Sequence, residues 1–312
     1  MRKPLNPLYS DYTTMPLRES LLSKLNASGL APIASRLVDL SRESFRLRSS
    51  PIEDHLLPVG ASKLGGCPDL PPTLAWPTWK TGPLSFVAQL NLSDVPPNNL
   101  LPNTGVLSFF YDMEQSAWGF DPNHREGFRT WYFPAASALV RRSEPSRPVP
   151  GGMLRRLQAL VSGEPARASA FRSCRLSFDS FLSLPESASA SVADLLLELE
   201  DEEIYSNFLE TYIGPAPQHQ LLGLPQPVQG EMELECQLVT NGLYTGDPTG
   251  FKDPRRKTLE PGAADWTLLL QVDSDDSVGM MWGDLGTLYF WIRRQDLARC
   301  SFDRVWTILQ CH

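Results

Sequence analysis

Two segments that repeat one pattern constrain the fold of this 312-residue chain more than any other feature. Residues 84–91 match residues 266–273 in the order of their apolar positions, and Gln89 corresponds to Gln271. Alternation of apolar and polar residues is typical of β-strands. Self-similarity between distant segments indicates that one structural unit occurs twice along the chain.

The match continues on both sides of these segments. Gly105 and Gly286 each follow after a hairpin-sized gap, and each opens an apolar, aromatic run. Further corresponding segments are residues 66–69 with 223–226, and residues 128–131 with 302–306. Apolar residues that recur every three or four positions predict an amphipathic helix at the start of each copy. This shared order of features favours a duplication.

The duplication predicts an α+β fold. A small sheet with one apolar face is marginally stable alone, so two such units should face each other across one core. We therefore predict two units related by a pseudo-twofold axis, each a helix plus an antiparallel β-sheet, packed into one compact domain over residues 1–312. The copies are placed at about 15–140 and 186–312, and a variable excursion at about 141–185 separates them.

The charge balance argues against two classes of partner. The formal net charge is -8, and no long block of Lys and Arg is present, so neither nucleic acid nor an anionic membrane is expected. The first residues lack the apolar stretch of a secretory signal, and no run approaches the ~18 apolar residues of a membrane-spanning helix. Scattered cysteines in odd number favour reduced thiols in a cytoplasmic protein. They are Cys67, Cys174, Cys236, Cys300 and Cys311.

Several segments resemble the YwqG-like family, a mainly bacterial family without an assigned activity. They are residues 64–71, 83–90, 118–121, 222–230 and 280–292. The resemblance covers nearly the whole chain apart from residues 143–175, and it is most specific in the last segment. It implies a shared fold and supplies no catalytic residues. Because some relatives lie near toxin–immunity loci, it also implies a protein-binding role of the immunity type.

The candidate binding site lies on the connection that follows the second repeated segment. Asp273, Asp275 and Asp284 could bind a divalent cation through their carboxylate oxygens. Trp282 could wall the site, and Gln271 together with Gln89 would complete the ligand-binding residues. The alternative is an ordinary turn, in which Asp and Ser side chains bond their own backbone.

Two other groups of residues are compatible with catalysis. Glu231, Glu233 and Glu235 alternate with apolar residues, so on a strand they would share one face as an acid–base group or a solvated face. Cys67 follows two glycines and could be a nucleophile or a buried structural thiol. The histidines available as its base are His55, His124 and His219.

Two functions follow from these observations. The first is a non-catalytic binding protein whose partner is another protein or a small ligand. The second is a metal-dependent hydrolase that uses Asp273, Asp275 and Asp284. No organic cofactor is expected, because none of the familiar nucleotide-binding or hydrolase motifs occurs in the sequence. Whether the protein is an enzyme stays open at this point.

Overall fold

The computed structural model describes residues 8–80, 82–145, 169–199 and 203–312, with side chains from Pro16 onward. One ten-stranded sheet dominates it, and every pair of neighbouring strands is antiparallel. In spatial order its strands are β14 (Trp306–Gln310), β13 (Thr287–Arg293), β12 (Trp266–Asp273), β11 (Gln220–Leu221), β1 (Arg42–Pro51), β10 (Cys174–Ser183), β2 (Lys63–Leu64), β6 (Ser85–Asn91), β7 (Val106–Tyr111) and β8 (Phe128–Phe133). Two small sheets pair β3 (Asp69–Leu70) with β9 (Val140–Arg141), and β4 (Thr78–Trp79) with β5 (Gly82–Pro83).

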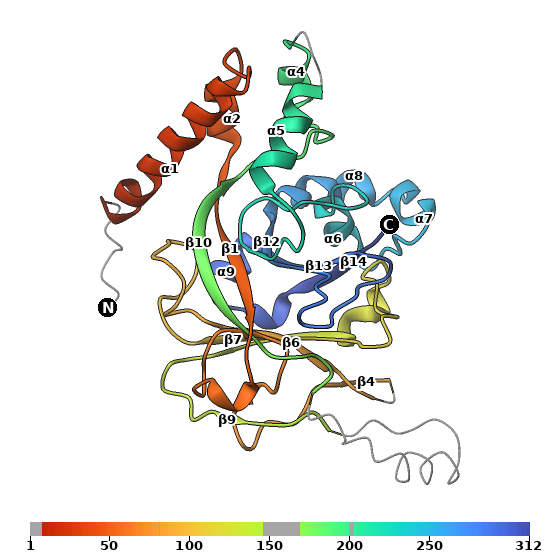
Figure 1. Ribbon diagram of the computed structural model, residues 1–312. Coiled ribbons are helices and arrows are strands. Elements are labelled where there is room, and N and C mark those ends of the chain that lie inside the picture. Colours follow the sequence, from red (N-terminus) through yellow and green to blue (C-terminus); the bar gives the residue numbers. More distant parts are fainter. Residues whose placement is uncertain (1–7, 81, 146–168, 200–202) are drawn as a thin grey trace.

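The prediction of two units, each a helix plus its own sheet, is wrong because the sheet is continuous. Strands β1 and β10 pair along their whole length at its centre, and Figure 1 shows them as two long neighbouring ribbons. Strand β1 precedes the N-terminal strands in the chain, yet it pairs with β11 of the C-terminal half. Strand β10 precedes the C-terminal strands, yet it pairs with β2. Each half therefore gives its first strand to the other half.

The helices near the N-terminus and the chain midpoint share one apolar cluster at an end of the β1–β10 ribbon (Figure 1). These helices are α1 (Leu8–Ala27), α2 (Ala34–Leu40), α4 (Ala193–Leu196) and α5 (Glu203–Ile213). Tyr205 and Leu37 are buried in the cluster beside Leu182 of β10. These helices thus do not each cover a sheet of their own. No helix within the described ranges has both the length and the apolar character needed to cross a membrane.

The short helices lie between the later strands. They are α6 (Glu233–Val239), α7 (Pro248–Lys252), α8 (Arg256–Leu259) and α9 (Arg294–Ala298). The 3-10 turns are η1 (Asp54–Leu56), η2 (Pro122–Glu126), η3 (Glu260–Asp265) and η4 (Phe302–Arg304). Glu233 and Glu235 lie in helix α6, so the alternating glutamates do not form a strand. Met232, Cys236 and Val239 are buried at helical spacing, and this period decides the local structure.

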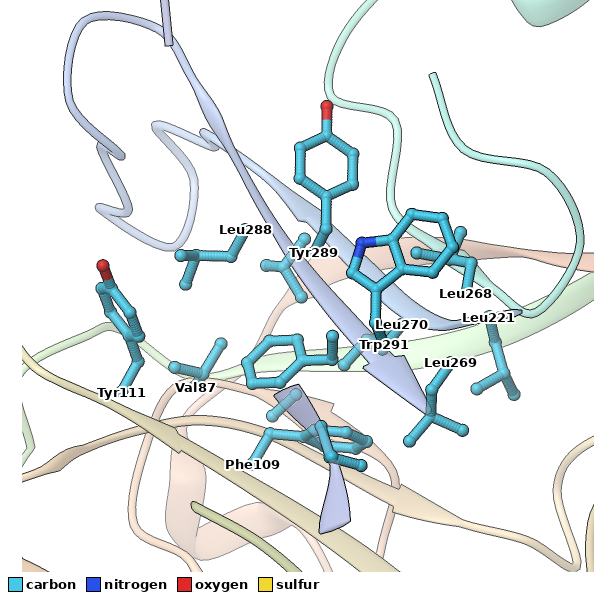
Figure 2. Close-up of a cluster of buried hydrophobic side chains, with 14 of the residues drawn as sticks. Val87, Phe109, Tyr111, Leu221, Leu268, Leu269, Leu270, Leu288, Tyr289 and Trp291 are labelled. Carbon is cyan, nitrogen blue, oxygen red and sulfur yellow. The ribbon is translucent and has the colours of Figure 1, made fainter. Parts of the chain in front are cut away.

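The largest core joins the two ends of the sheet. Phe109 of β7 contacts Phe290 of β13 with ring centroids 5.0 Å apart, and Phe128 of β8 contacts Trp306 of β14 at 5.1 Å. Figure 2 shows Phe109 among side chains of the C-terminal strands. Edge-to-face aromatic pairs of this kind add to the stability that burial of the rings provides. The core therefore makes the two ends of the sheet depend on each other.

Strands β6 and β12, each the third strand from an end of the sheet, have the same ladder pattern. Gln89 pairs with Lys63 of β2, and Gln271 pairs with Gln220 of β11. A register shift precedes each glutamine in its strand. It lies between Phe86 and Ala88 in β6 and between Leu268 and Leu270 in β12. The two ends thus present matching backbone positions with different side chains. A common origin of the two ends stays a prediction.

Candidate functional site

The two repeated glutamines are buried and fully bonded. Gln271 accepts a hydrogen bond from the backbone N of Gln226 (3.0 Å) and donates to the carbonyl of Gln218 and to Gln226 Oε1 (both 2.9 Å). Gln89 accepts from the backbone N of Asp69 (2.8 Å) and donates to the carbonyl of Ala61 and to Asp69 Oδ2 (both 2.9 Å). Their amides hold loops in place and have no donor or acceptor turned to a ligand.

The predicted aspartates bind separate donors of the protein itself. Asp273 accepts from the backbone N of Gln218 (2.9 Å) and the hydroxyl of Thr287 (3.0 Å). Asp275 accepts from the Ser49 hydroxyl (3.1 Å) and from the backbone N of Ser277 (2.7 Å), whereas Asp284 is exposed. Among the described residues no group of three or more His, Cys, Asp or Glu side chains is arranged to hold a metal ion.

Trp282 belongs to the core instead of walling a pocket. Its side chain is 1 % exposed, and its ring makes edge contacts with Tyr111 (5.8 Å between centroids) and Phe171 (5.6 Å). The preceding loop is held by turn bonds, because the Ser274 hydroxyl accepts from the backbone N of Trp282 (3.0 Å). The connection from Gln271 to Trp282 therefore has the hydrogen bonds expected of a structural turn.

The predicted bases are engaged in the same way. His219 is buried, its Nδ1 accepts from the backbone N of Asp273 (3.1 Å), and its Nε2 consequently donates to Asp275 Oδ2 (3.2 Å). Burial would raise the pKa of Asp275, but the hydrogen bonds from His219 and Ser277 outweigh it and lower that pKa. His124 Nδ1 accepts from the backbone N of Gly119 (3.1 Å). Both ring nitrogens of His219 and one of His124 are therefore occupied by partners in the protein.

Two further groups lack the properties that catalysis needs. Burial raises the pKa of the Cys67 thiol, which disfavours the thiolate that acts as a nucleophile. Glu233 and Glu235 start helix α6 and do not share a strand face with Glu231. Burial raises the pKa of Glu235 to about 7, and its carboxyl group accepts from the Thr245 hydroxyl (3.2 Å). Burial also raises the pKa of the neighbouring Cys236 thiol, which disfavours its thiolate.

The sequence analysis missed a buried charged cluster, which consists of Asp54, Lys63, Asp69, Gln89 and Arg141. Lys63 and Asp69 are both 0 % exposed. Lys63 Nζ lies 2.9 Å from Asp54 Oδ1 and 4.0 Å from Asp69 Oδ2, and it also donates to the carbonyl of Cys67. Burial lowers the pKa of Lys63, and the neighbouring carboxylates oppose this change.

Arg141 closes the charged cluster on its other side. Its Nε and Nη2 donate to the two carboxylate oxygens of Asp69 (2.9 and 3.2 Å), and it donates to the carbonyls of Leu57 (3.0 Å) and Pro58 (3.1 Å). The backbone N of Gly60 donates to Asp69 Oδ2 as well (2.8 Å). Burial would raise the pKa of Asp69, but these donors outweigh it and lower that pKa. The cluster therefore satisfies its own charges. A comparison of residues 66–69 with 223–226 could have drawn attention to it.

At the other end of the sheet, three amides occupy the matching positions. This glutamine cluster consists of Gln220, Gln226 and Gln271. Gln226 Nε2 donates to Gln220 Oε1 (3.1 Å), and Gln220 Nε2 donates to the carbonyls of Leu222 and Leu224 (both 2.7 Å). Like the charged cluster, it is a closed network.

An open hollow, which we call the arginine cleft, is lined by several arginines. It has a volume of about 580 Å³ and lies beside the end of β13, the start of β14, the end of α6 and turn η2. Its lining residues are Pro122, Arg125, Val239, Thr240, Gly242, Trp266, Arg293, Gln295, Asp296, Arg299, Arg304 and Trp306. Sequence analysis missed it because its arginines come from separate segments.

Comparison with known proteins supplies one match to a family. The model of the family described as "Domain of unknown function (DUF1963)" matches residues 62–311, which is most of the chain. No curated protein matches the sequence. The matched range begins just before Lys63 and includes the glutamine cluster, the arginine cleft and every member of the charged cluster except Asp54.

Proposed function

We propose that this chain, which belongs to the family described as Domain of unknown function (DUF1963), is a YwqG-like protein that binds a ligand without transforming it. The observation that carries the proposal is a contrast between its polar groups. The side chains of the charged and glutamine clusters are bonded to one another. The guanidinium groups of Arg293 and Arg299 in the arginine cleft make no ion pair with any residue that the structure describes.

The state of the candidate catalytic groups supports a binding function. Catalysis needs a group that is free to exchange a proton or to attack a substrate. Both ring nitrogens of His219 are bonded, Asp69 accepts from three side chains or amides, and burial raises the pKa of the Cys67 thiol. The hydrolase alternative lacks support as well, since its aspartates do not converge within the described part of the chain.

The proposal is tested by asking what happens to a natural ligand. We would purify the protein from its host, detect a bound molecule by native mass spectrometry and identify it after unfolding. The purified ligand would then be incubated in excess with the protein, with and without Mg²⁺ or Mn²⁺. We expect the ligand to be recovered unchanged. Conversion of more than one ligand molecule per protein would contradict a binding function.

A thermal melt addresses the metal-dependent alternative directly. A cation that binds only the native state raises stability by RT ln(1 + [L]/Kd). Because the carboxylates of Asp273 and Asp275 are occupied by donors of the protein, we expect no shift of the melting temperature with Mg²⁺, Mn²⁺ or Ca²⁺. A saturable shift of the melting temperature that Asp273→Asn abolishes would support the metal-dependent hydrolase instead.

A further inference from the structure

The arginine cleft has the opposite charge from the protein as a whole. The chain carries a formal net charge of -8, whereas the cleft is lined by four arginines and a single acidic residue, Asp296. Like charges gathered in one hollow repel one another when nothing neutralises them. Glu126 and Asp303 act on Arg125, so the arginines of the cleft without an ion-pair partner among the described residues are Arg293 and Arg299.

The four arginines differ in how far the protein already uses them. Arg125 donates to the carbonyls of Val305 (3.3 Å) and Asp303, so it fastens turn η2 to the start of β14. Arg304 lies 3.9 Å from Asp296, and its side chain is 68 % exposed. A contact at this distance and exposure contributes little stability. Asp296 therefore leaves the positive charge of the cleft largely uncompensated.

The other two arginines have no carboxylate partner among the described residues. The guanidinium of Arg293 lies over the ring of Trp266, 5.0 Å from its centroid. Arg299 makes no hydrogen bond or ion pair through its side chain with the described residues. Each guanidinium has five N–H donors in a planar fork, which fits the oxygens of a phosphate or carboxylate. These two side chains supply the free donors of the cleft.

Two buried indoles in the wall of the cleft are fixed by hydrogen bonds. Trp266 Nε1 donates to Gln237 Oε1 (3.0 Å), and Trp306 Nε1 donates to the carbonyl of Gly119 (2.9 Å). Both indoles are buried at the rim of the main core. Fixed walls reduce the ordering that a ligand must bring about when it binds. The volume of about 580 Å³ lies within the range of pockets for small molecules, roughly 300–1,000 Å³.

We infer that the arginine cleft binds a small molecule that carries phosphate groups. A phosphate group has about −1.5 to −2 charges and three acceptor oxygens, so it matches several guanidinium groups better than one carboxylate does. A hollow can take up such a group between several guanidinium groups, whereas an acidic protein surface would need no hollow. This inference rests on the proposed binding function and adds to it the chemical class of the ligand.

Calorimetric titration with sodium pyrophosphate at constant ionic strength tests the inference. We expect saturable binding to the wild type, and binding weakened roughly tenfold or more in the double variant Arg293→Gln/Arg299→Gln, because charged hydrogen bonds are lost. Arg294→Gln is the matched control. Arg294 is an exposed neighbour on α9 that does not line the cleft, so this variant should bind like the wild type.

Each result of the titration decides the inference. It is overturned if pyrophosphate fails to bind the wild type, if Arg294→Gln weakens binding as much as the double variant, or if citrate binds through Arg293 and Arg299 as tightly as pyrophosphate. Thermal melts of both variants show whether they are folded. If the double variant is not folded, the single variant Arg299→Gln replaces it in the titration, because Arg299 is exposed in the native state. A phosphate-free natural ligand recovered unchanged would overturn the inference but leave the binding function intact. Turnover of a phosphorylated ligand would contradict the binding function but leave intact the inference that the ligand carries phosphate.

Discussion

The charged cluster and the glutamine cluster occupy matching positions at the two ends of one sheet, yet one contains ions and the other neutral amides. Lys63 and Gln220 pair with Gln89 and Gln271 in the same register. Each of these two glutamines accepts from the backbone N of one residue outside the main sheet, Asp69 or Gln226, and donates to a carbonyl and to that residue's side chain. The glutamine amide is thus the common structural element.

The two clusters differ in the additional partners that their buried side chains need. Buried Lys63 and Asp69 would be costly without further partners, because two charges lose their hydration. Asp54 of η1 and Arg141 of β9 provide those partners and attach both segments to the sheet. The glutamine cluster satisfies itself without ions. The charges of the N-terminal end therefore stabilise peripheral segments that the C-terminal end lacks.

Loss of one buried charge should have the largest effect. We expect Lys63→Gln to lower the free energy of unfolding by about 3–5 kcal/mol, since it leaves Asp69 and Asp54 short of a partner. The double variant Lys63→Gln/Asp69→Gln copies the other end of the sheet. It should be more stable than Lys63→Gln alone, because Arg141 Nε and Asp54 Oδ2, 3.5 Å apart, still pair. Urea unfolding measures both values.

A surface ion pair provides the control for this comparison. Arg48 and Asp179 are paired at 3.0 Å with side chains about 60 % exposed, so Arg48→Gln should cost about 1 kcal/mol or less. If the double variant were no more stable than Lys63→Gln alone, the two clusters would not be interchangeable and the comparison would fail.

Removal of the shared amides should have the next largest effect. Gln89→Ala and Gln271→Ala each leave a buried backbone N and a carbonyl without a partner, which costs about 1–3 kcal/mol per unsatisfied group. Gln89→Ala also removes a donor to the carboxylate of Asp69, so we expect the larger loss at the N-terminal end. Equal losses in urea unfolding would show that the charge of Asp69 does not depend on Gln89.

A smaller effect depends on pH and concerns the C-terminal half alone. Burial raises the pKa of Glu235 from 4.5 to about 7, so the folded state holds this proton more tightly than the unfolded state. The resulting stability is complete below the unfolded pKa and is lost as the pH rises through about 7. Glu235→Gln should flatten the fall in stability between about pH 5 and 8, whereas Glu210→Gln, at an exposed position of α5, should leave it unchanged. Thermal melts across this range distinguish the two variants.

The smallest effect is expected at an exposed member of the predicted site. Asp284 is exposed and lies outside both clusters, so Asp284→Asn should change the free energy of unfolding by no more than about 0.5 kcal/mol. Asp273→Asn should cost more, because Asp273 accepts from Gln218 and Thr287. If both variants were equally harmless, the turn would be less structural than its hydrogen bonds indicate.

Some of this architecture could be predicted from sequence, and some could not. Strands β6, β7, β12 and β13 lie where apolar runs predict strands, because their buried residues follow one another closely. Strands β1 and β10 contain many Arg and Ser residues and only partly buried positions. Such composition resembles that of a loop, so the two strands that unite the halves gave no comparable signal.

The two polar clusters and the cleft were difficult for a related reason. Asp54, Lys63 and Arg141 meet only because β3 pairs with β9 and η1 folds over them. Arg125 reaches the cleft from a different part of the chain than Arg293 and Arg299. By contrast, the acidic residues after Gln271 are adjacent in sequence but bond different donors. Proximity in sequence therefore did not bring these carboxylates together in the structure.

The most direct test of the account compares pyrophosphate binding in the cluster variant and the cleft variant. No residue of the charged cluster lines the cleft, and distant sites usually act independently to within about twofold in affinity. We predict that folded Lys63→Gln/Asp69→Gln binds pyrophosphate like the wild type, whereas Arg293→Gln/Arg299→Gln binds roughly tenfold or more weakly. Loss of binding in the folded cluster variant, with binding retained in the cleft variant, would contradict the division between a structural cluster and a binding cleft.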